Sequence, residues 1–320
     1  MLEAAKGNSI REVLESQKPK NKEPINKRVL DSWIDTIENT IPGEKNGRLA
    51  WLVASAIVAA VLQKTVDGDG KSRFLMKGGT FLQHRLGDIA RSTRDLDGLV
   101  RGNMDDFISS LDSVLQEQWG LLQLVRGEVE TIETPAKIIK PRSFTISINL
   151  KGETWRKITV EVSPEEGRVG EEHEYLRPPA LGALGLPTPD VLVTLAMRYQ
   201  IAQKVHSATD PHDPPLYVNN RPRDVVDLLL IRNLVEETGE PSCHSIREAI
   251  LDVFTARAEE ANTLGRIARS WPARAVALPN WFADYSAAAE TVDLRLTLEE
   301  AVDQVNEWLD EIDLGEGAAG

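Results

Sequence analysis

The segment from residue 77 to residue 97 constrains the fold of this chain more than any other part of its sequence. The apolar run Phe74-Leu75-Met76 leads directly into Lys77-Gly78-Gly79-Thr80, and a helix-forming segment follows. This order predicts a strand, a tight turn and a helix N-terminus. Glycines let the backbone approach an anion, and the free N–H groups at a helix N-terminus attract it, so such a turn can hold a phosphate. A purely structural turn is the alternative.

Two aspartates, Asp95 and Asp97, lie at the end of the same segment. On a strand, residues i and i+2 point to the same face, so the two carboxylates would share one face while Leu96 points into the core. Two carboxylates on one face suit Mg²⁺, which binds a few protein oxygens together with substrate phosphates. An exposed strand edge without a ligand is the alternative. The two motifs in this order favour a site for a metal and a nucleotide phosphate.

In these motifs the chain resembles the AbiEii/AbiGii-type nucleotidyltransferase toxins, which include the MenT toxins and belong to the DNA polymerase β-like nucleotidyltransferase superfamily. The resemblance covers roughly residues 45 to 310. It implies an α+β fold, in which an N-terminal polymerase β-like sheet flanked by helices is followed by a C-terminal helical domain. It also implies that Asp95 and Asp97 are catalytic and bind the metal, and that the nucleotide is bound by Gly78, Gly79, Thr80, Arg91 and Thr93.

The segment from Lys157 to Ser163 alternates between apolar and polar residues. On a strand, Ile158, Val160 and Val162 would share one face, and Glu161 would lie on the other. Enzymes of the superfamily that the chain resembles bring a third metal-binding carboxylate from a neighbouring strand, and Glu161 is the matching position. The family more often has aspartate there. The alternative is an exposed glutamate on a half-buried strand.

Two motifs in the second half of the chain also resemble the family. The segment around Lys204 is similar to one with an essential lysine, which implies a catalytic residue that holds the nucleotide's phosphates; judged alone, it would be a solvated helix residue. The segment from Asn219 to Leu228 is similar to Arg-x-(Lys/Arg)-Asp-x-x-Asp-Leu. Asp224 would pair with Lys204 or orient the base and ribose, with helix capping as the alternative. Asp227 is expected to be structural and to pair with a nearby arginine, either Arg221 or Arg223.

The composition is that of an ordinary globular protein, with 320 residues, 41% of them hydrophobic and 27% charged. The apolar run from Leu49 to Leu62 is shorter than the roughly 20 residues that cross a bilayer, so it predicts a buried helix and no membrane span. Residues 1–17 lack the apolar core of a signal peptide. The single cysteine, Cys243, excludes an internal disulfide and a cysteine-based metal cluster, and it favours the cytoplasm.

The net charge of −13 is unevenly distributed. Residues 293–316 contain nine acidic residues and one arginine, so they carry −8 and leave −5 for the rest of the chain. A local basic surface for nucleic acid is therefore compatible with the acidic total. The candidate ligands of a phosphate backbone, with solvated arginines as the alternative, are Arg221, Arg223, Arg266, Arg269 and Arg274.

The expected domain organisation is a flexible terminus at 1–25, a nucleotidyltransferase domain at 26–180, a helical domain at 185–315 that completes the active site, and a tail at 316–320. A Pro- and Gly-rich segment from Pro178 to Pro189 marks the boundary. Strands are expected near residues 121–130, 143–150 and 155–163, and helices at 26–41, 48–64, 104–119, 246–261, 280–289 and 298–312. A further helix is expected to start at Thr188-Pro189-Asp190 and to bury Leu192 and Leu195.

The resemblance implies a Mg²⁺- or Mn²⁺-dependent enzyme that transfers a nucleoside monophosphate from an NTP to RNA. The expected acceptor is the 3′ end of tRNA, and the expected setting is a type IV-like toxin–antitoxin system that blocks translation in phage defence. The expected partners are the acceptor RNA and a cognate antitoxin, AbiEi-like or kinase-like. Thr93 stands where many relatives have serine, and in some of them the partner antitoxin modifies that hydroxyl; the alternative role of Thr93 is to fix the loop by hydrogen bonding.

Two other classes of function stay open. A nucleotide-binding or interaction module without chemistry would be favoured if Glu161 lay far from the aspartate pair. A small-molecule nucleotidyltransferase would be favoured by a narrow acidic pocket, and a wide basic groove would favour RNA. Trp271, Trp281 and Tyr285 could stack on bases, but aromatic residues at this spacing are expected to be core. The five histidines show no zinc-site spacing.

Overall fold

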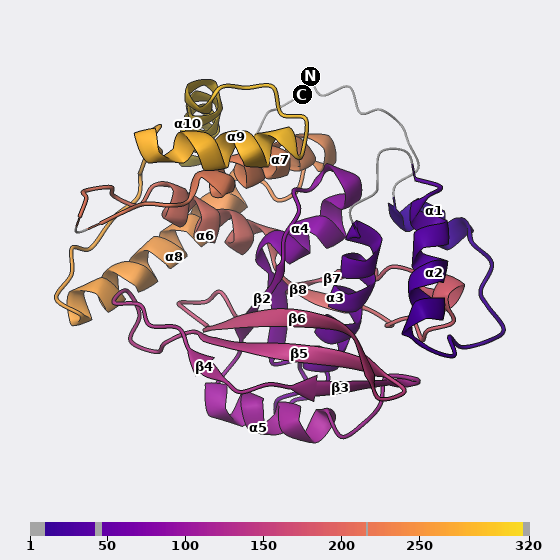
Figure 1. The fold of residues 1–320 in the computed structure, drawn as a ribbon. Helices are drawn as coiled ribbons and strands as arrows, with labels where there is room; N and C mark the ends of the chain where they lie inside the picture. Colours follow the sequence, from indigo (N-terminus) through magenta and orange to yellow (C-terminus); the bar gives the residue numbers. More distant parts are fainter. Residues whose placement is uncertain (1–9, 42–46, 216, 316–320) are drawn as a thin grey trace.

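The centre of the protein is one mixed β-sheet (Figure 1), and the computed structural model describes residues 10–41, 47–215 and 217–315. The strand order is β3-β5-β6-β2-β1-β8-β7, with β4 also paired to β5. Strand β2 is parallel to β6, β1 is parallel to β8, and the other pairs are antiparallel. The strands are β1 (Phe74–Lys77), β2 (Asp95–Val100), β3 (Leu122–Arg126), β4 (Glu130–Thr131), β5 (Arg142–Leu150), β6 (Glu153–Pro164), β7 (His173–Leu176) and β8 (Leu192–Leu195).

The helices divide into a set around the sheet and a set that gathers on one side of it, α6 to α10 (Figure 1). This arrangement confirms the predicted α+β class with a helical C-terminal part. The helices are α1 (Ile10–Ser16), α2 (Lys27–Glu38), α3 (Arg48–Gln63), α4 (Gly78–Leu86), α5 (Met104–Val114), α6 (Met197–Ala208), α7 (Pro222–Thr238), α8 (Cys243–Thr263), α9 (Phe282–Glu290) and α10 (Leu298–Leu314). Short 3-10 helices lie at η1 (Gly87–Ile89), η2 (Leu181–Leu184) and η3 (Pro279–Trp281).

Helix α3 is the buried centre of the sheet-containing part. Thirteen of its sixteen residues are buried, and it packs against β1, β6 and β8 as well as α4 and α5. A helix that is apolar on every side is stable only when other elements surround it, so the prediction of a buried helix is confirmed. In the described ranges, no helix is both long and apolar enough to span a membrane.

The strand, turn and helix predicted around the paired glycines are present. Strand β1 ends at Lys77, and α4 begins at the next residue, Gly78. Strand β2 pairs with β1 on one side and with β6 on the other. Leu96 is fully buried, as are Val160 and Val162, so the apolar faces of β2 and β6 point into the core. The polar faces of both strands are therefore turned the other way, toward the candidate site.

The helix predicted to start at Thr188-Pro189-Asp190 is wrong in its first part. Leu192–Leu195 forms strand β8, which joins β1 and β7, and α6 begins only at Met197. The run Val191-Leu192-Val193-Thr194-Leu195 is short, apolar and rich in β-branched residues. Such a run fits a strand buried in a sheet as well as a helix, and pairing with two neighbours decides in favour of the strand.

Other differences from the expected elements are smaller. Helix α5 ends at Val114, five residues before the predicted end. Within the predicted flexible terminus, residues 10–16 form α1, whose Ile10, Val13 and Leu14 are buried. The division of the chain into domains at 26–180 and 185–315 stays a prediction, and the predicted tail at 316–320 lies outside the described residues.

Candidate active site

Three carboxylates lie together on the polar face of two neighbouring strands. Asp97 of β2 is directly opposite Glu161 of the parallel strand β6, and Asp95 is opposite Thr159. Lys77 of β1 is opposite Asp97 on the other side. One row across three strands therefore reads Lys77, Asp97, Glu161, and all three residues are half-buried.

The pKa values of the two facing acids are perturbed. Burial raises the pKa of Asp97, with Asp95 adding to the effect and Lys77 and Lys204 opposing it. Burial also raises the pKa of Glu161, and the charges of Asp97 and Asp95 raise it further. Like charges held this close favour protonation of one of them unless a positive charge is supplied. A bound cation would therefore lower the pKa values of both acids.

The carboxylate set fits a magnesium site of the kind completed by substrate. Among the described residues, no group of three or more histidine, cysteine, aspartate or glutamate side chains is placed so that it could hold a metal ion by itself. Mg²⁺ does not require one, because it usually takes one or two protein carboxylates and fills its shell with water and substrate phosphates. The pairing of Asp97 with Glu161 on neighbouring strands, where Asp97 and Asp95 raise the pKa of Glu161, is the observation that favours a cation here.

The turn between β1 and α4 can be made only by glycine. Gly78 has φ +69°, and a Cβ atom there would lie 2.3 Å from Oδ2 of Asp97. A Cβ atom on Gly79 would lie 3.0 Å from Oγ1 of Thr93. The turn therefore packs directly against the Asp97 carboxylate and against the loop that leads into β2.

The three residues of this turn have different surroundings. Gly78 and Gly79 line the cleft described below, and the backbone N–H of Gly78 donates to Oε1 of Gln200 (3.1 Å). The side chain of Thr80 is fully buried, and its hydroxyl donates to the carbonyl oxygen of Asp95 (2.7 Å). The Thr80 hydroxyl therefore holds β2 in place, and Thr80 is not among the residues that line the cleft.

A buried ionic network joins the loop before β2 to helices α6 and α7. Arg91 donates two hydrogen bonds to the carboxylate of Asp227, at 2.8 and 3.0 Å. Lys204 of α6 donates to Asp227 (2.6 Å) and to Asp224 (2.9 Å). The predicted pairing of Asp224 with Lys204 is confirmed. The predicted pairing of Asp227 with Arg221 or Arg223 is wrong, because Asp227 points inward from α7 and both arginines are exposed.

The network fixes the charges of its members. Burial acts to lower the pKa of Lys204, but Asp224 and Asp227 outweigh it and raise that pKa. Burial acts to raise the pKa of Asp227, but Lys204 and Arg91 outweigh it and lower that pKa. Lys204 therefore stays protonated, close enough to Asp97 to affect its pKa as well.

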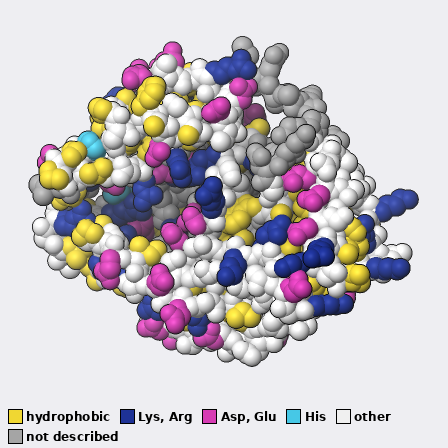
Figure 2. Space-filling view, viewed as in Figure 1, with side chains coloured by type: hydrophobic (Ala, Val, Ile, Leu, Met, Phe, Trp, Pro, Cys, Tyr) yellow, Lys and Arg dark blue, Asp and Glu magenta, His cyan; other side chains and the backbone are white. Residues whose placement is uncertain are grey.

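A cleft of about 1090 Å³ opens above the carboxylate row, between the sheet and the helical part. Eight lysine and arginine side chains line it, against five aspartate and glutamate side chains, although the whole chain carries −13. Figure 2 shows dark blue side chains in the hollow on this face. The cleft is wide and locally basic, which is the surface expected for a nucleic acid.

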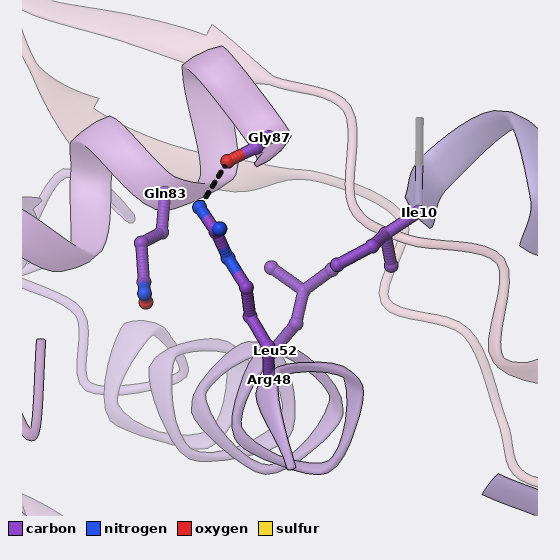
Figure 3. Close-up of a pocket in the computed structure, with 5 residues that line it drawn as sticks. All are labelled: Ile10, Arg48, Leu52, Gln83 and Gly87. Atoms are coloured by element: carbon purple, nitrogen blue, oxygen red, sulfur yellow. Dashed lines mark hydrogen bonds between the residues drawn. The ribbon is translucent and has the colours of Figure 1, made fainter. Parts of the chain in front are cut away.

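A second hollow is too small for a nucleotide. It has a volume of about 10 Å³ and is lined by Ile10, Arg48, Leu52, Gln83 and Gly87 (Figure 3). Arg48 donates to the carbonyl oxygen of Gly87 (2.7 Å), which holds the end of α4 against α3. A space of this size holds about one water molecule, so the large cleft is the candidate site.

Sequence reasoning missed two residues of the cleft. The ammonium group of Lys77 donates to Oγ of Ser163 (2.7 Å), and Gln200 is buried, bridging the Gly78 N–H to the carbonyl oxygen of Leu195. The position of Lys77 directly before the paired glycines is a signal that could have identified it. Gln200 carries no such signal, because its role depends on β8, which was predicted as helix.

Most of the aromatic residues and arginines predicted as possible nucleic-acid ligands have structural contacts instead. Trp281 and Tyr285 are buried core residues, as expected, and Trp271 donates to Asp313. Arg269 is bound to Asp210 and Arg274 to Asp310.

Comparison with known proteins connects this architecture to one family. Residues 60–309 match the family described as nucleotidyl transferase AbiEii toxin of a type IV toxin–antitoxin system. Among solved structures, the chain is similar to MenT4, a nucleotidyltransferase toxin from Mycobacterium tuberculosis H37Rv, with 18% sequence identity and a TM-score of 0.44. That similarity covers 84% of this chain and 91% of MenT4. The chain matches no curated protein sequence.

Proposed function

This chain belongs to the AbiEii nucleotidyltransferase toxin family of type IV toxin–antitoxin systems, and we propose that it transfers a nucleoside monophosphate from an NTP to RNA. The proposed acceptor is the 3′ end of tRNA, the proposed consequence is blocked translation, and the proposed setting is phage defence. NTP and tRNA are cytoplasmic molecules, so the cytoplasm is the proposed compartment.

The observation that carries the proposal is the direct pairing of Asp97 with Glu161 beside a turn that only glycine can make. A carboxylate set next to backbone N–H groups at a helix N-terminus is suited to a triphosphate with its metal ion. A binding module without chemistry loses support, because Glu161 is next to Asp97. A small-molecule enzyme also loses support, because the cleft is wide and basic.

In the proposed reaction, a hydroxyl oxygen at the end of the RNA attacks the α-phosphorus of the NTP. The bond from that phosphorus to the bridging oxygen of the β-phosphate breaks, pyrophosphate leaves, and the hydroxyl proton passes to solvent. Catalysis of such a transfer consists mainly of placing the two reactants in line and stabilising negative charge.

Each part of the site has a proposed role in this reaction. Asp95, Asp97 and Glu161 would hold Mg²⁺ or Mn²⁺, which when bound supplies positive charge to the reacting phosphate and the leaving pyrophosphate. The backbone at the start of α4, at Gly79, would bind phosphate oxygens, and Thr80 would hold the turn against β2.

The ionic network would support the nucleotide from the opposite side. Lys204, fixed by Asp224 and Asp227, would act as a constant positive charge for the triphosphate. Arg91 uses two of its N–H groups on Asp227, so it would position Lys204 through that carboxylate and reach the nucleotide only with its remaining donors.

A cognate antitoxin, AbiEi-like or kinase-like, is the proposed partner. Thr93 is half-buried and lies next to the Gly79 turn. A phosphate on Thr93 would place negative charge beside the proposed triphosphate site and repel the substrate. Thr93 is therefore a proposed position for control by an antitoxin.

The test is to incubate the purified protein with total tRNA, Mg²⁺ and each α-labelled NTP in turn. Asp95→Ala is the inactive control, and Asp303→Ala, on the far helix α10, is the matched control that leaves the site unchanged. Label on tRNA with the wild type and Asp303→Ala, but not with Asp95→Ala, is expected. Transfer of label to no RNA from any NTP, by protein that binds NTP, would contradict the proposal.

A further inference from the structure

The basic residues of the cleft differ in whether they are free to bind a ligand. Five of the eight are bound to acidic partners within the protein: Arg91, Lys137, Lys204, Arg257 and Arg269. In the part of the chain that the structure describes, the other three, Lys77, Arg221 and Arg266, form no ion pair. The Lys77 ammonium donates to Ser163 instead, which leaves Arg221 and Arg266. These two are therefore cations that the fold leaves available to phosphates.

Arg221 and Arg266 line the same cleft as Asp97 and Glu161. Arg221 is close enough to Glu161 to act on its pKa, although burial and the two aspartates act more strongly in the other direction. Arg221 and Arg266 both act on the pKa of Asp210, which burial raises overall. Arg221 thus acts on the carboxylate row and, together with Arg266, on Asp210.

The cleft also has an aromatic surface beside Arg266. The Arg266 guanidinium lies over the ring of Tyr217, with its Cζ 5.5 Å from the ring centroid. Tyr217 is fixed by two backbone hydrogen bonds with Asp213, of 2.8 and 2.9 Å. Two exposed apolar side chains of the same wall, Val218 at 51% and Ile267 at 82% exposure, lie beside this pair in sequence and also line the cleft.

This combination matches an unpaired nucleic acid strand better than a duplex. Single-stranded RNA presents bases that stack on aromatic rings and guanidinium planes, together with phosphates that bind cations. An A-form duplex stacks its bases inside the helix and is contacted through its sugar and phosphate groups, so its bases could not stack on Tyr217 or Ile267. A folded protein partner would not require a row of free arginines that leads to the carboxylates.

We propose that Tyr217, Arg266 and Ile267, together with Arg221, bind the last unpaired nucleotides of the acceptor RNA. The bases stack on Tyr217 and Ile267, and the phosphates follow Arg266 and Arg221 toward Glu161. This inference rests on the proposed transfer to RNA. It adds that the enzyme selects acceptors with an unpaired end and discriminates against blunt duplexes.

The first experiment compares two labelled RNA hairpins of the same stem, one with a four-nucleotide 3′ overhang and one blunt, in fluorescence anisotropy titrations without NTP. Tyr217→Ala is expected to weaken binding of the overhang hairpin by roughly 5- to 150-fold, which is the range for loss of one stacked base, and to leave binding of the blunt hairpin unchanged. Tyr217→Phe keeps the ring and is expected to bind like the wild type.

The arginines are tested by the salt dependence of binding. Arg221→Ala and Arg266→Ala are each expected to reduce the slope of log K against log salt for the overhang hairpin by about 0.7, the value for one phosphate contact on a single strand. Arg274→Ala is the matched control, because Arg274 lies in the same connecting segment but is exposed and paired with Asp310.

The outcomes separate this inference from the proposed function. If the wild type labels tRNA but Tyr217→Ala binds the overhang hairpin as tightly as the wild type, the inference is overturned and the function stands. Equal weakening for the blunt and overhang hairpins also overturns it. If the wild type neither binds nor labels any RNA, the proposed function fails and the inference fails with it. An unchanged KM for NTP in Tyr217→Ala supports a role confined to the acceptor.

Discussion

Replacing Asp227 by asparagine should show how much the buried ionic network contributes to stability. The side chain of Asp227 is fully buried, and its carboxylate accepts two hydrogen bonds from Arg91 and one from Lys204. Asparagine keeps the shape but removes the negative charge, so two buried cations lose their common partner. Removing one partner of a buried pair costs about 3–5 kcal/mol, and we expect a loss near that range.

Asp224→Asn is the matched control within the same network. Asp224 is 13% exposed and receives one hydrogen bond, from Lys204. Lys204 keeps Asp227 in this variant, so the expected loss is about 1.5 kcal/mol, typical of one hydrogen bond to a charged group. Urea unfolding followed by tryptophan fluorescence measures both losses as changes in midpoint at constant m-value.

The dependence on pH gives a second check of the same reasoning. Lys204 and Arg91 lower the pKa of Asp227 below its ordinary value of 3.8 in spite of burial. A carboxylate with a depressed pKa stabilises the fold above its unfolded-state pKa, and this contribution is lost as pH falls toward the folded-state pKa. The difference between the wild type and Asp227→Asn should therefore shrink below about pH 4. A loss under about 1 kcal/mol at pH 7, or one equal to that of Asp224→Asn, would refute the account of Asp227 as the common partner of two buried cations.

Three further predictions concern other parts of the site. Gly78→Ala should abolish transfer, because its Cβ would displace the Asp97 carboxylate, and the left-handed backbone alone should cost about 1–2 kcal/mol of stability; transfer near the wild-type rate would contradict this. Gln200→Leu should raise the KM for NTP more than it lowers kcat, since Gln200 holds the Gly78 N–H; unchanged steady-state kinetics would argue against that role. Arg257 and Lys137 hold the pKa of Glu166 well below its ordinary value despite burial. In Glu166→Gln, the free energy of unfolding should therefore fall less steeply than in the wild type as pH drops below about 4.5. An equally steep fall in both proteins, measured by urea unfolding at several pH values, would count against this.

The parts of the fold that depend on local sequence could be predicted. The alternation in Lys157–Ser163 places Glu161 on a polar strand face whatever the strand pairs with. The paired glycines mark the turn between β1 and α4, and this signal also does not depend on distant contacts. Both signals are contained within a few residues, so they correctly identified the strand, the turn and the face that carries the carboxylates.

The parts that depend on distant contacts could not be predicted. Leu192–Leu195 became a strand because β1, more than a hundred residues earlier, offers an open edge, and a short apolar run does not specify this by itself. Asp227 lies 136 positions from its partner Arg91, so its partner could not be predicted from Arg221 and Arg223, the nearest arginines in sequence. The lack of an ion-pair partner for Arg266 among the described residues likewise depends on which acidic residues the other arginines bind.

The long separation between Arg91 and Asp227 also matters while the chain is being made. The ribosome delivers residues 74 to 97, with the glycine turn and both aspartates, long before it delivers Asp227. An unfinished chain lacks the carboxylate that holds Arg91 and Lys204 together, and truncated fragments lack it permanently. For a protein proposed to stop translation, this order means that the ribosome synthesising it has translated as far as Asp227 before an active molecule can exist.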